Sequence, residues 1–162
     1  GLKKDNINYR GFIFFGLIKV NDEPYVIEYN VRMGDPESEV VLPRIKSDLL
    51  ELLYVAGNGN LKDHKIIIDD KKAATVFLVS GGYPEQYEKN KEIFGLDSVI
   101  DSLVFHAGAK YEDGKVKTNG GRVIAITSIG NSVEEALKKS YKSIKKINFE
   151  KMNYRKDIGF DL

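Results

Sequence analysis

Hydrophobic residues follow two different patterns in the first 32 positions. Residues 11–20 are nearly all apolar, with bulky side chains at both odd and even positions, and this is typical of a strand buried on both faces. After the turn-forming residues 21–24, residues 25–32 alternate with a period of two, so that Tyr, Ile, Tyr and Val share one face. Residues 11–32 therefore predict an antiparallel hairpin.

A loop and a helix are predicted next. Residues 33–38 contain the sequence Gly-Asp-Pro, which is typical of a loop. From Ser47 onward the spacing becomes helical; Ser47 or Asp48 can cap the first turn, and Gly57 is placed to end the last. The apolar positions of this helix are Leu49, Leu50, Leu52, Leu53 and Ala56.

The second half of the chain predicts short strands followed by one well-signalled helix. The strands are residues 73–80, 99–106, 115–118 with a partner before the turn at 113–114, and 122–128. Ser132 and Glu135 form a capping box, in which each side chain accepts a hydrogen bond from the other's free backbone N–H. The following apolar stripe predicts packing on a sheet and consists of Val133, Ala136, Leu137, Ser140, Tyr141, Ile144 and Ile147.

The change in pattern near residues 57–72 predicts two units, residues 1–60 and 61–162, in an α+β chain. The second unit is large enough to form a hydrophobic core of its own. The first contains a very apolar strand with little to cover it, and a two-stranded ribbon alone is marginally stable. We therefore expect the first unit to be the end of something larger.

Composition and charge narrow the class of protein. The 162 residues carry 25 Lys plus Arg against 24 Asp plus Glu, which disfavours binding of nucleic acid or an acidic membrane by bulk charge. Zero cysteines exclude disulfides, thiol catalysis and Cys-ligated metals, and are compatible with a reducing compartment. The longest apolar stretches fall far short of the ~20 residues that span a bilayer, so no membrane partner is expected.

Candidate chemistry lies on the polar face of the second predicted strand. Glu28, Asn30 and Arg32 stand at i, i+2 and i+4, so a carboxylate, an amide and a guanidinium project side by side. Carboxylate and amide oxygens suit Mg²⁺, and an arginine matches the geometry of a carboxylate or phosphate. The same alternation is also typical of a strand whose outer face is simply in solvent.

A longer motif surrounds these residues. Residues 26–37 read Val-Ile-Glu-Tyr-Asn-Val-Arg-Met-Gly-Asp-Pro-Glu and resemble the end of the ATP-grasp domain in the phosphoribosylamine–glycine ligase family, also called glycinamide ribonucleotide synthetase. The Glu-x-Asn-x-Arg core is similar to ATP-grasp enzymes generally, whereas Arg-x-Gly-Asp-Pro-Glu is characteristic of this family. Further similar segments follow in order along nearly the whole chain, at residues 10–17, 40–49, 80–84, 104–108, 118–123 and 155–159.

The resemblance implies a fold and an activity. The fold would be the end of an ATP-grasp domain, a hairpin plus a helix, followed by a small β-rich C-terminal domain with a packed helix. The activity would join glycine to 5-phosphoribosylamine, through a glycyl phosphate, to give glycinamide ribonucleotide, ADP and phosphate in de novo purine biosynthesis. ATP is then a co-substrate, Mg²⁺ or Mn²⁺ the metal, and the cytoplasm the expected location.

Carried over by position, the resemblance also implies residue roles. Glu28 and Asn30 match the metal ligands, and Arg32 matches the arginine that faces substrate or the developing acyl phosphate. Asp35 and Glu37 are candidate contacts for a substrate amine. Some ATP-grasp enzymes carry another metal carboxylate twelve residues before the first, but here that position is Gly16.

Lys46 is a further candidate for contact with an anionic substrate. It lies just before the predicted helix, whose first turn offers free N–H groups and a favourable dipole.

The resembling family has a nucleotide-fold N-terminal domain, a small lid and the rest of the ATP-grasp sheet before this region, and none of these is in the chain. We expect the chain to be catalytically silent without those portions. Two alternatives stay open: a fragment of another ATP-grasp carboxylate–amine ligase, and a non-enzymatic β-rich binding module.

Overall fold

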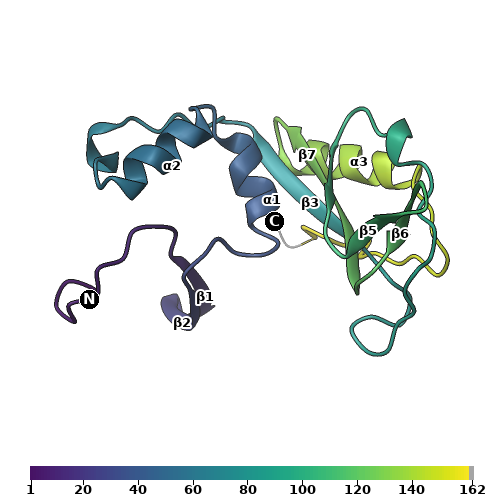
Figure 1. Ribbon diagram of the computed structural model, residues 1–162, viewed down its shortest axis with the longest axis horizontal. Helices are drawn as coiled ribbons and strands as arrows, with labels where there is room; N and C mark the ends of the chain where they lie inside the picture. Colours follow the sequence, from purple (N-terminus) through teal and green to yellow (C-terminus); the bar gives the residue numbers. More distant parts are fainter. Residues whose placement is uncertain (161–162) are drawn as a thin grey trace. The chain divides into compact units, whose positions relative to one another are not determined.

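The computed structural model describes residues 1–160 and divides into two compact units, Gly1–Asp69 and Asp70–Leu162 (Figure 1). The division follows Asp69, whereas the sequence pattern placed it after residue 60. Both units combine helices with antiparallel strands, so the predicted α+β class is confirmed.

The first unit begins with the predicted hairpin. Strand β1 (Phe14–Val20) pairs antiparallel with β2 (Glu23–Asn30). The connecting residues Asn21 and Asp22 have φ of 50° and 65°, the left-handed pair that a tight hairpin turn requires. The register places Gly16 opposite Glu28, and it shifts by a bulge between Gly16 and Leu17.

The expected burial of both faces of the first strand is wrong for this unit. Phe15 and Ile18 lie on opposite faces of β1 and are each 51% exposed, and on β2 Tyr29 is 65% exposed. Phe15 and Tyr29 contact each other edge to face, with ring centroids 5.2 Å apart. The hairpin is apolar, but its unit provides no second layer to cover it.

Short helices complete the first unit. The helix α1 (Ser38–Val41) leads into a 3₁₀ turn, η1 (Leu42–Arg44), and α2 (Leu49–Gly57) precedes a second turn, η2 (Leu61–Asp63). Of the two predicted caps of α2, the structure uses Asp48, whose Oδ1 accepts a hydrogen bond of 2.9 Å from the Glu51 N–H.

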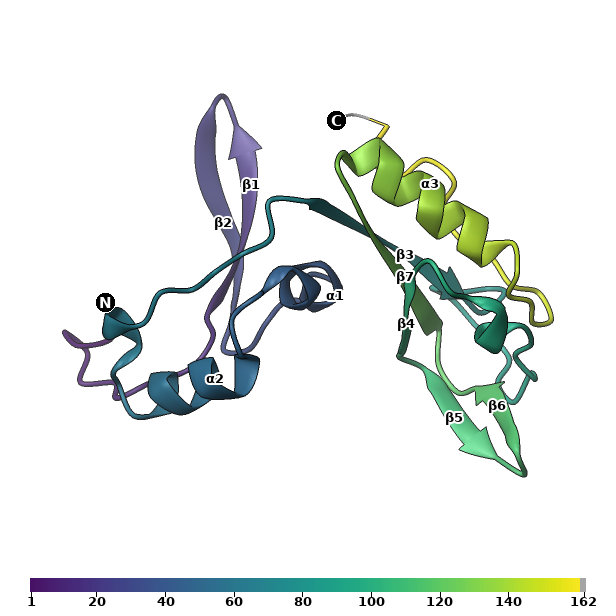
Figure 2. The same cartoon turned by 90° about the horizontal axis from the view of Figure 1, so that it is seen from above.

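The second unit is built on a three-stranded antiparallel sheet. Its strand order is β3 (Lys72–Val79), β7 (Arg122–Gly130), β4 (Leu103–His106), so the last strand in sequence lies in the middle. Helix α3 (Val133–Ile144) packs against β3 and β7, as predicted (Figure 2). The fully buried side chains of the core include Val76, Leu78, Ile124, Ile126 and Ile144.

Helix α3 begins at the predicted cap with one change. The Ser132 hydroxyl accepts a hydrogen bond of 3.1 Å from the Glu135 N–H, but the Glu135 carboxylate accepts from Asn131 N–H, one residue before the cap. Ser140, on the buried stripe, is bonded to the Ser128 hydroxyl at 2.9 Å. This bond explains how a polar residue is tolerated between helix and sheet.

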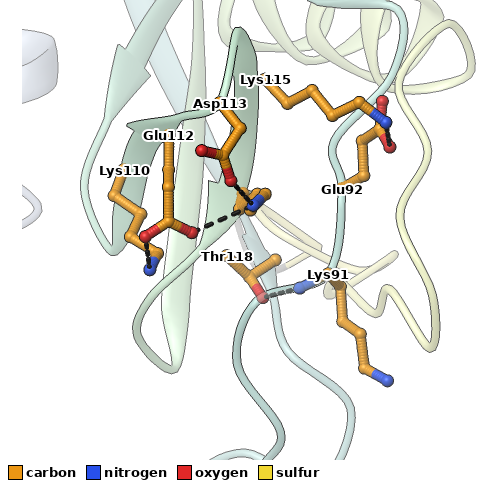
Figure 3. Close-up of polar contacts among 8 residues, drawn as sticks. Lys91, Glu92, Lys110, Glu112, Asp113, Lys115 and Thr118 are labelled. Carbon is orange, nitrogen blue, oxygen red and sulfur yellow. Dashed lines mark hydrogen bonds and ion pairs between the residues drawn. The ribbon is translucent and has the colours of Figure 1, made fainter.

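A small hairpin in the second unit carries a cluster of ion pairs. Strands β5 (Ala109–Glu112) and β6 (Lys115–Thr118) form the hairpin. The 3₁₀ turn η3 (Leu96–Ser98) lies earlier in the chain, before β4. Lys117 Nζ lies 3.0 Å from Glu112 and 3.1 Å from Asp113. Lys115 Nζ lies 2.7 Å from Glu92 (Figure 3). Hydrogen bonds from Lys110 and Lys117 hold the pKa of Glu112 below its ordinary value. Across the described residues, no helix is both long and apolar enough to span a membrane.

Candidate functional site

The polar side chains of β2 form the centre of the candidate site. Glu28 and Asn30 project from the same face of the strand, and Asn30 Nδ2 donates a hydrogen bond of 3.0 Å to Glu28 Oε1. Their partners across the hairpin are Gly16 and Phe14, respectively. The hydrogen bond holds the Asn30 amide beside the Glu28 carboxylate.

Gly16 leaves space for the Glu28 side chain. A Cβ atom at Gly16 would lie only 2.8 Å from Glu28 Cγ, which is closer than ordinary side-chain contacts. The position that carries a carboxylate in some ATP-grasp enzymes therefore lies directly across the hairpin from Glu28 and is filled here by the Glu28 stem.

Glu37 joins Glu28 at a shared groove. The groove has a volume of about 480 Å³, and both residues line it. Glu37 is half-buried and lies immediately before α1. The remaining walls are formed by Phe14, Phe15, Gly16, Leu17 and Ile27. Two acidic residues nine positions apart in sequence thus line one largely apolar groove.

The other predicted site residues do not line this groove. Arg32 lies beyond the end of β2, is exposed, and donates a hydrogen bond of 2.9 Å from Nη1 to the Met33 carbonyl. Asp35 lies between Arg32 and Glu37 in the loop before α1. Lys46 forms an ion pair of 2.8 Å with Asp69, so binding a substrate anion would compete with an internal partner.

Two neighbours of the groove were not predicted from the sequence. Phe14 forms one wall, and Gly34 is a buried loop residue against which both Phe14 and Glu37 pack. The sequence indicates Gly34 only as a turn former. No local pattern signals these contacts, because they depend on how the loop folds back over the hairpin.

The donor set fits a divalent cation of the Mg²⁺ or Mn²⁺ type. Glu28 and Asn30 offer hard oxygen atoms on one face, and Mg²⁺ usually takes one or two protein carboxylates and completes its shell with water and phosphate oxygens. Residues 1–160 contain no group of three or more His, Cys, Asp or Glu side chains placed to hold a metal. A cation at Glu28 and Asn30 would complete its shell with water and phosphate oxygens.

Comparison with known proteins bears on both units. The family described as "Phosphoribosylglycinamide synthetase, C domain" matches residues 73–161, and the ATP-grasp (A) domain of the same synthetase matches residues 1–38. A phosphoribosylamine–glycine ligase of Fusobacterium nucleatum is 47% identical over 98% of this chain. The trifunctional purine biosynthetic protein adenosine-3 of Gallus gallus is 44% identical over 99% of it.

A solved structure is similar as well. The crystal structure of phosphoribosylamine–glycine ligase from Thermotoga maritima matches 96% of this chain with a TM-score of 0.84 and 37% sequence identity. In each case the relative is much longer. The chain spans 38% of the Fusobacterium protein, 16% of the Gallus protein and 39% of the Thermotoga chain.

Proposed function

Because the chain belongs to the phosphoribosylglycinamide synthetase family, whose C domain matches more than half of its residues, we propose that it is the C-terminal portion of a phosphoribosylamine–glycine ligase. The complete enzyme would join glycine to 5-phosphoribosylamine at the expense of ATP, through a glycyl phosphate, in de novo purine biosynthesis in the cytoplasm. The family predicted from the sequence motifs is confirmed.

In this proposal Glu28 and Asn30 hold Mg²⁺ or Mn²⁺. When bound, the cation neutralises phosphate charge and orients the phosphates of ATP. The chain's own contribution is orientation: Asn30 donates to one carboxylate oxygen of Glu28, which holds the two side chains next to each other on one face of β2. The hydrogen bond between these two side chains is the observation that carries the proposal.

The substrate side of the site would be formed by the loop after β2. Arg32 is exposed, and its planar guanidinium suits the carboxylate of glycine or the charge of a transferring phosphoryl group. Asp35 and Glu37 would hold the amine of glycine or of phosphoribosylamine. Lys46 would contact a substrate phosphate after leaving Asp69.

The partner of this chain would be the rest of the same enzyme. The ATP-grasp match covers only residues 1–38, so the lid, the adenine site and the nucleotide-fold domain would come from preceding sequence. We propose that residues 1–60 close the ATP-grasp domain, that residues 61–162 form the C-terminal domain, and that the isolated chain does not catalyse ligation.

A charge-removing substitution in the complete enzyme tests the metal assignment. Glu28→Gln keeps the shape of the side chain but loses its charge, so formation of glycinamide ribonucleotide at limiting Mg²⁺ should fall by at least about tenfold. Glu23→Gln, on the same strand but outside the groove, is the matched control and should keep full activity. Unchanged turnover of Glu28→Gln at limiting Mg²⁺ would contradict the assignment.

A further inference from the structure

We propose that Gly34 is a positioning residue for the ligase reaction: because it has no side chain, the Glu37 carboxylate can turn into the groove that it shares with Glu28 and face a cationic group of a ligand. This inference rests on the proposed function and deepens it. The cationic group is either a substrate ammonium or a divalent cation, and a carboxylate can bind either of them.

The geometry around Gly34 is crowded on two sides. A Cβ atom built on this residue would overlap Glu37 Oε2, and it would lie 2.9 Å from both Glu37 Cδ and Phe14 Cε2. Phe14 is on β1 and lines the groove beside Glu37. Any side chain at position 34 must therefore displace either the carboxylate or the aromatic wall of the groove.

Position 34 requires a glycine because there is no space for a Cβ atom, and not because of the backbone conformation. The described glycines with left-handed φ are Gly11, Gly59, Gly82, Gly95, Gly114 and Gly159, and Gly34 is not among them. A residue with a side chain could adopt the backbone of Gly34. What it could not do is leave room for Glu37.

The loop cannot easily relieve such a clash by moving Gly34. The Gly34 carbonyl accepts two hydrogen bonds from Ser38, 3.0 Å from its N–H and 2.7 Å from its hydroxyl. The Val41 N–H also donates to the Glu37 carbonyl at 3.0 Å. Both ends of the loop are thus anchored on α1, and the movable group is the Glu37 side chain.

The surroundings of Glu37 indicate what it faces. Its carboxylate is half-buried in a groove with Phe14, Phe15, Leu17 and Ile27 as apolar walls, and it has no hydrogen-bond or ion-pair partner among residues 1–160. A partly desolvated carboxylate is stabilised by a cationic partner. The groove offers that partner a place next to Glu28.

A double-mutant cycle in the complete ligase tests the inference. Gly34→Ala and Glu37→Gln should each raise the half-saturating concentration of one cationic ligand by about tenfold, as expected for loss of one charge-assisted hydrogen bond. The double variant should be no worse than Glu37→Gln alone, because the first change acts through the second residue. Gly57→Ala, where a Cβ meets nothing within 4 Å, is the matched control and should change nothing.

The readouts separate the two ligand sources. A raised KM for glycine or phosphoribosylamine identifies an ammonium, and a raised requirement for Mn²⁺ identifies the metal. Additive effects, or wild-type values for Gly34→Ala and Glu37→Gln, would overturn the inference. If those variants behave as wild type while Glu28→Gln is inactive, only this inference fails; if Glu28→Gln is also fully active, the proposed metal site fails with it.

A second variant controls for folding. Phe14→Leu combined with Gly34→Ala removes the overlap with the ring but keeps the overlap with Glu37. Relative to Gly34→Ala alone, this double variant should have a higher thermal unfolding midpoint, because the overlap with the ring is gone. It should keep the raised half-saturating concentration of the cationic ligand. Recovery of both quantities together would show that Gly34 has a structural role only, and would also overturn the inference.

Discussion

Replacement of Gly16 by alanine probes the geometry of the Glu28–Asn30 pair. The added Cβ would lie 2.8 Å from Glu28 Cγ, so the Glu28 side chain must retreat by about 0.6 Å to reach an ordinary contact of about 3.4 Å. The hydrogen bond from Asn30 Nδ2 to Glu28 Oε1 is now 3.0 Å, and a retreat of that size directed away from Asn30 would lengthen it to about 3.6 Å, which is no longer a hydrogen bond.

The size of the effect follows from that bond. Hydrogen bonds to charged groups contribute about 1.5–3 kcal/mol, and we take the lower end because both side chains lie at the surface of this unit. A loss of about 1.5 kcal/mol corresponds to an approximately tenfold change in an equilibrium constant. Gly16→Ala should therefore raise the Mn²⁺ concentration for half-maximal ligase activity about tenfold.

The assay is a Mn²⁺ titration of the complete ligase at saturating ATP, glycine and phosphoribosylamine. Gly57→Ala serves again as the control, because it adds the same methyl group in open space. An unchanged Mn²⁺ requirement in Gly16→Ala would refute the reasoning that Asn30 orients Glu28 for the metal. An equal rise in both variants would refute it as well.

Two further predictions concern the stability of the second unit. Ile126→Ala, at a fully buried position of β7, should lower the free energy of unfolding by about 2–5 kcal/mol in chemical denaturation, whereas Ile100→Ala, at a position 80% exposed, should change it by less than about 0.5 kcal/mol; equal effects would contradict the assigned core. Hydrogen bonds from Lys91 and Lys151 lower the pKa of Glu88 from 4.5 to about 2. The stabilisation that the charged Glu88 gives the folded state is therefore present above pH 4.5 and lost as the pH falls through about 2. The thermal unfolding midpoints of Glu88→Gln and wild type should converge over that interval. A difference in midpoint that stays constant with pH would contradict the ion pairs.

Local elements of this fold could be predicted from the sequence because their signals are local. The hairpin follows from alternation and turn residues, and the cap at Ser132 follows from a four-residue pattern. Burial could not be predicted in the same way. Phe15 and Leu17 are as apolar as core residues, but whether they are covered depends on side chains that are far away in sequence or outside the chain.

The candidate site was predictable to a similar degree. The side-by-side placement of Glu28 and Asn30 follows directly from the two-residue period of a strand. The approach of Glu37 to the same groove depends on the path of the loop through Gly34, which no periodicity encodes. The pairing of Lys46 with Asp69 joins segments 23 positions apart and was likewise invisible in the sequence.

The most direct test of the central claim is formation of glycinamide ribonucleotide from glycine, phosphoribosylamine and ATP. The assay compares the isolated chain, the preceding portion of the protein, and the two joined in one polypeptide. Our account predicts product only from the joined protein, since the ATP-grasp match extends over only residues 1–38 and the chain spans 38% of the Fusobacterium ligase. Product from the isolated chain, or none from the joined protein, would contradict it.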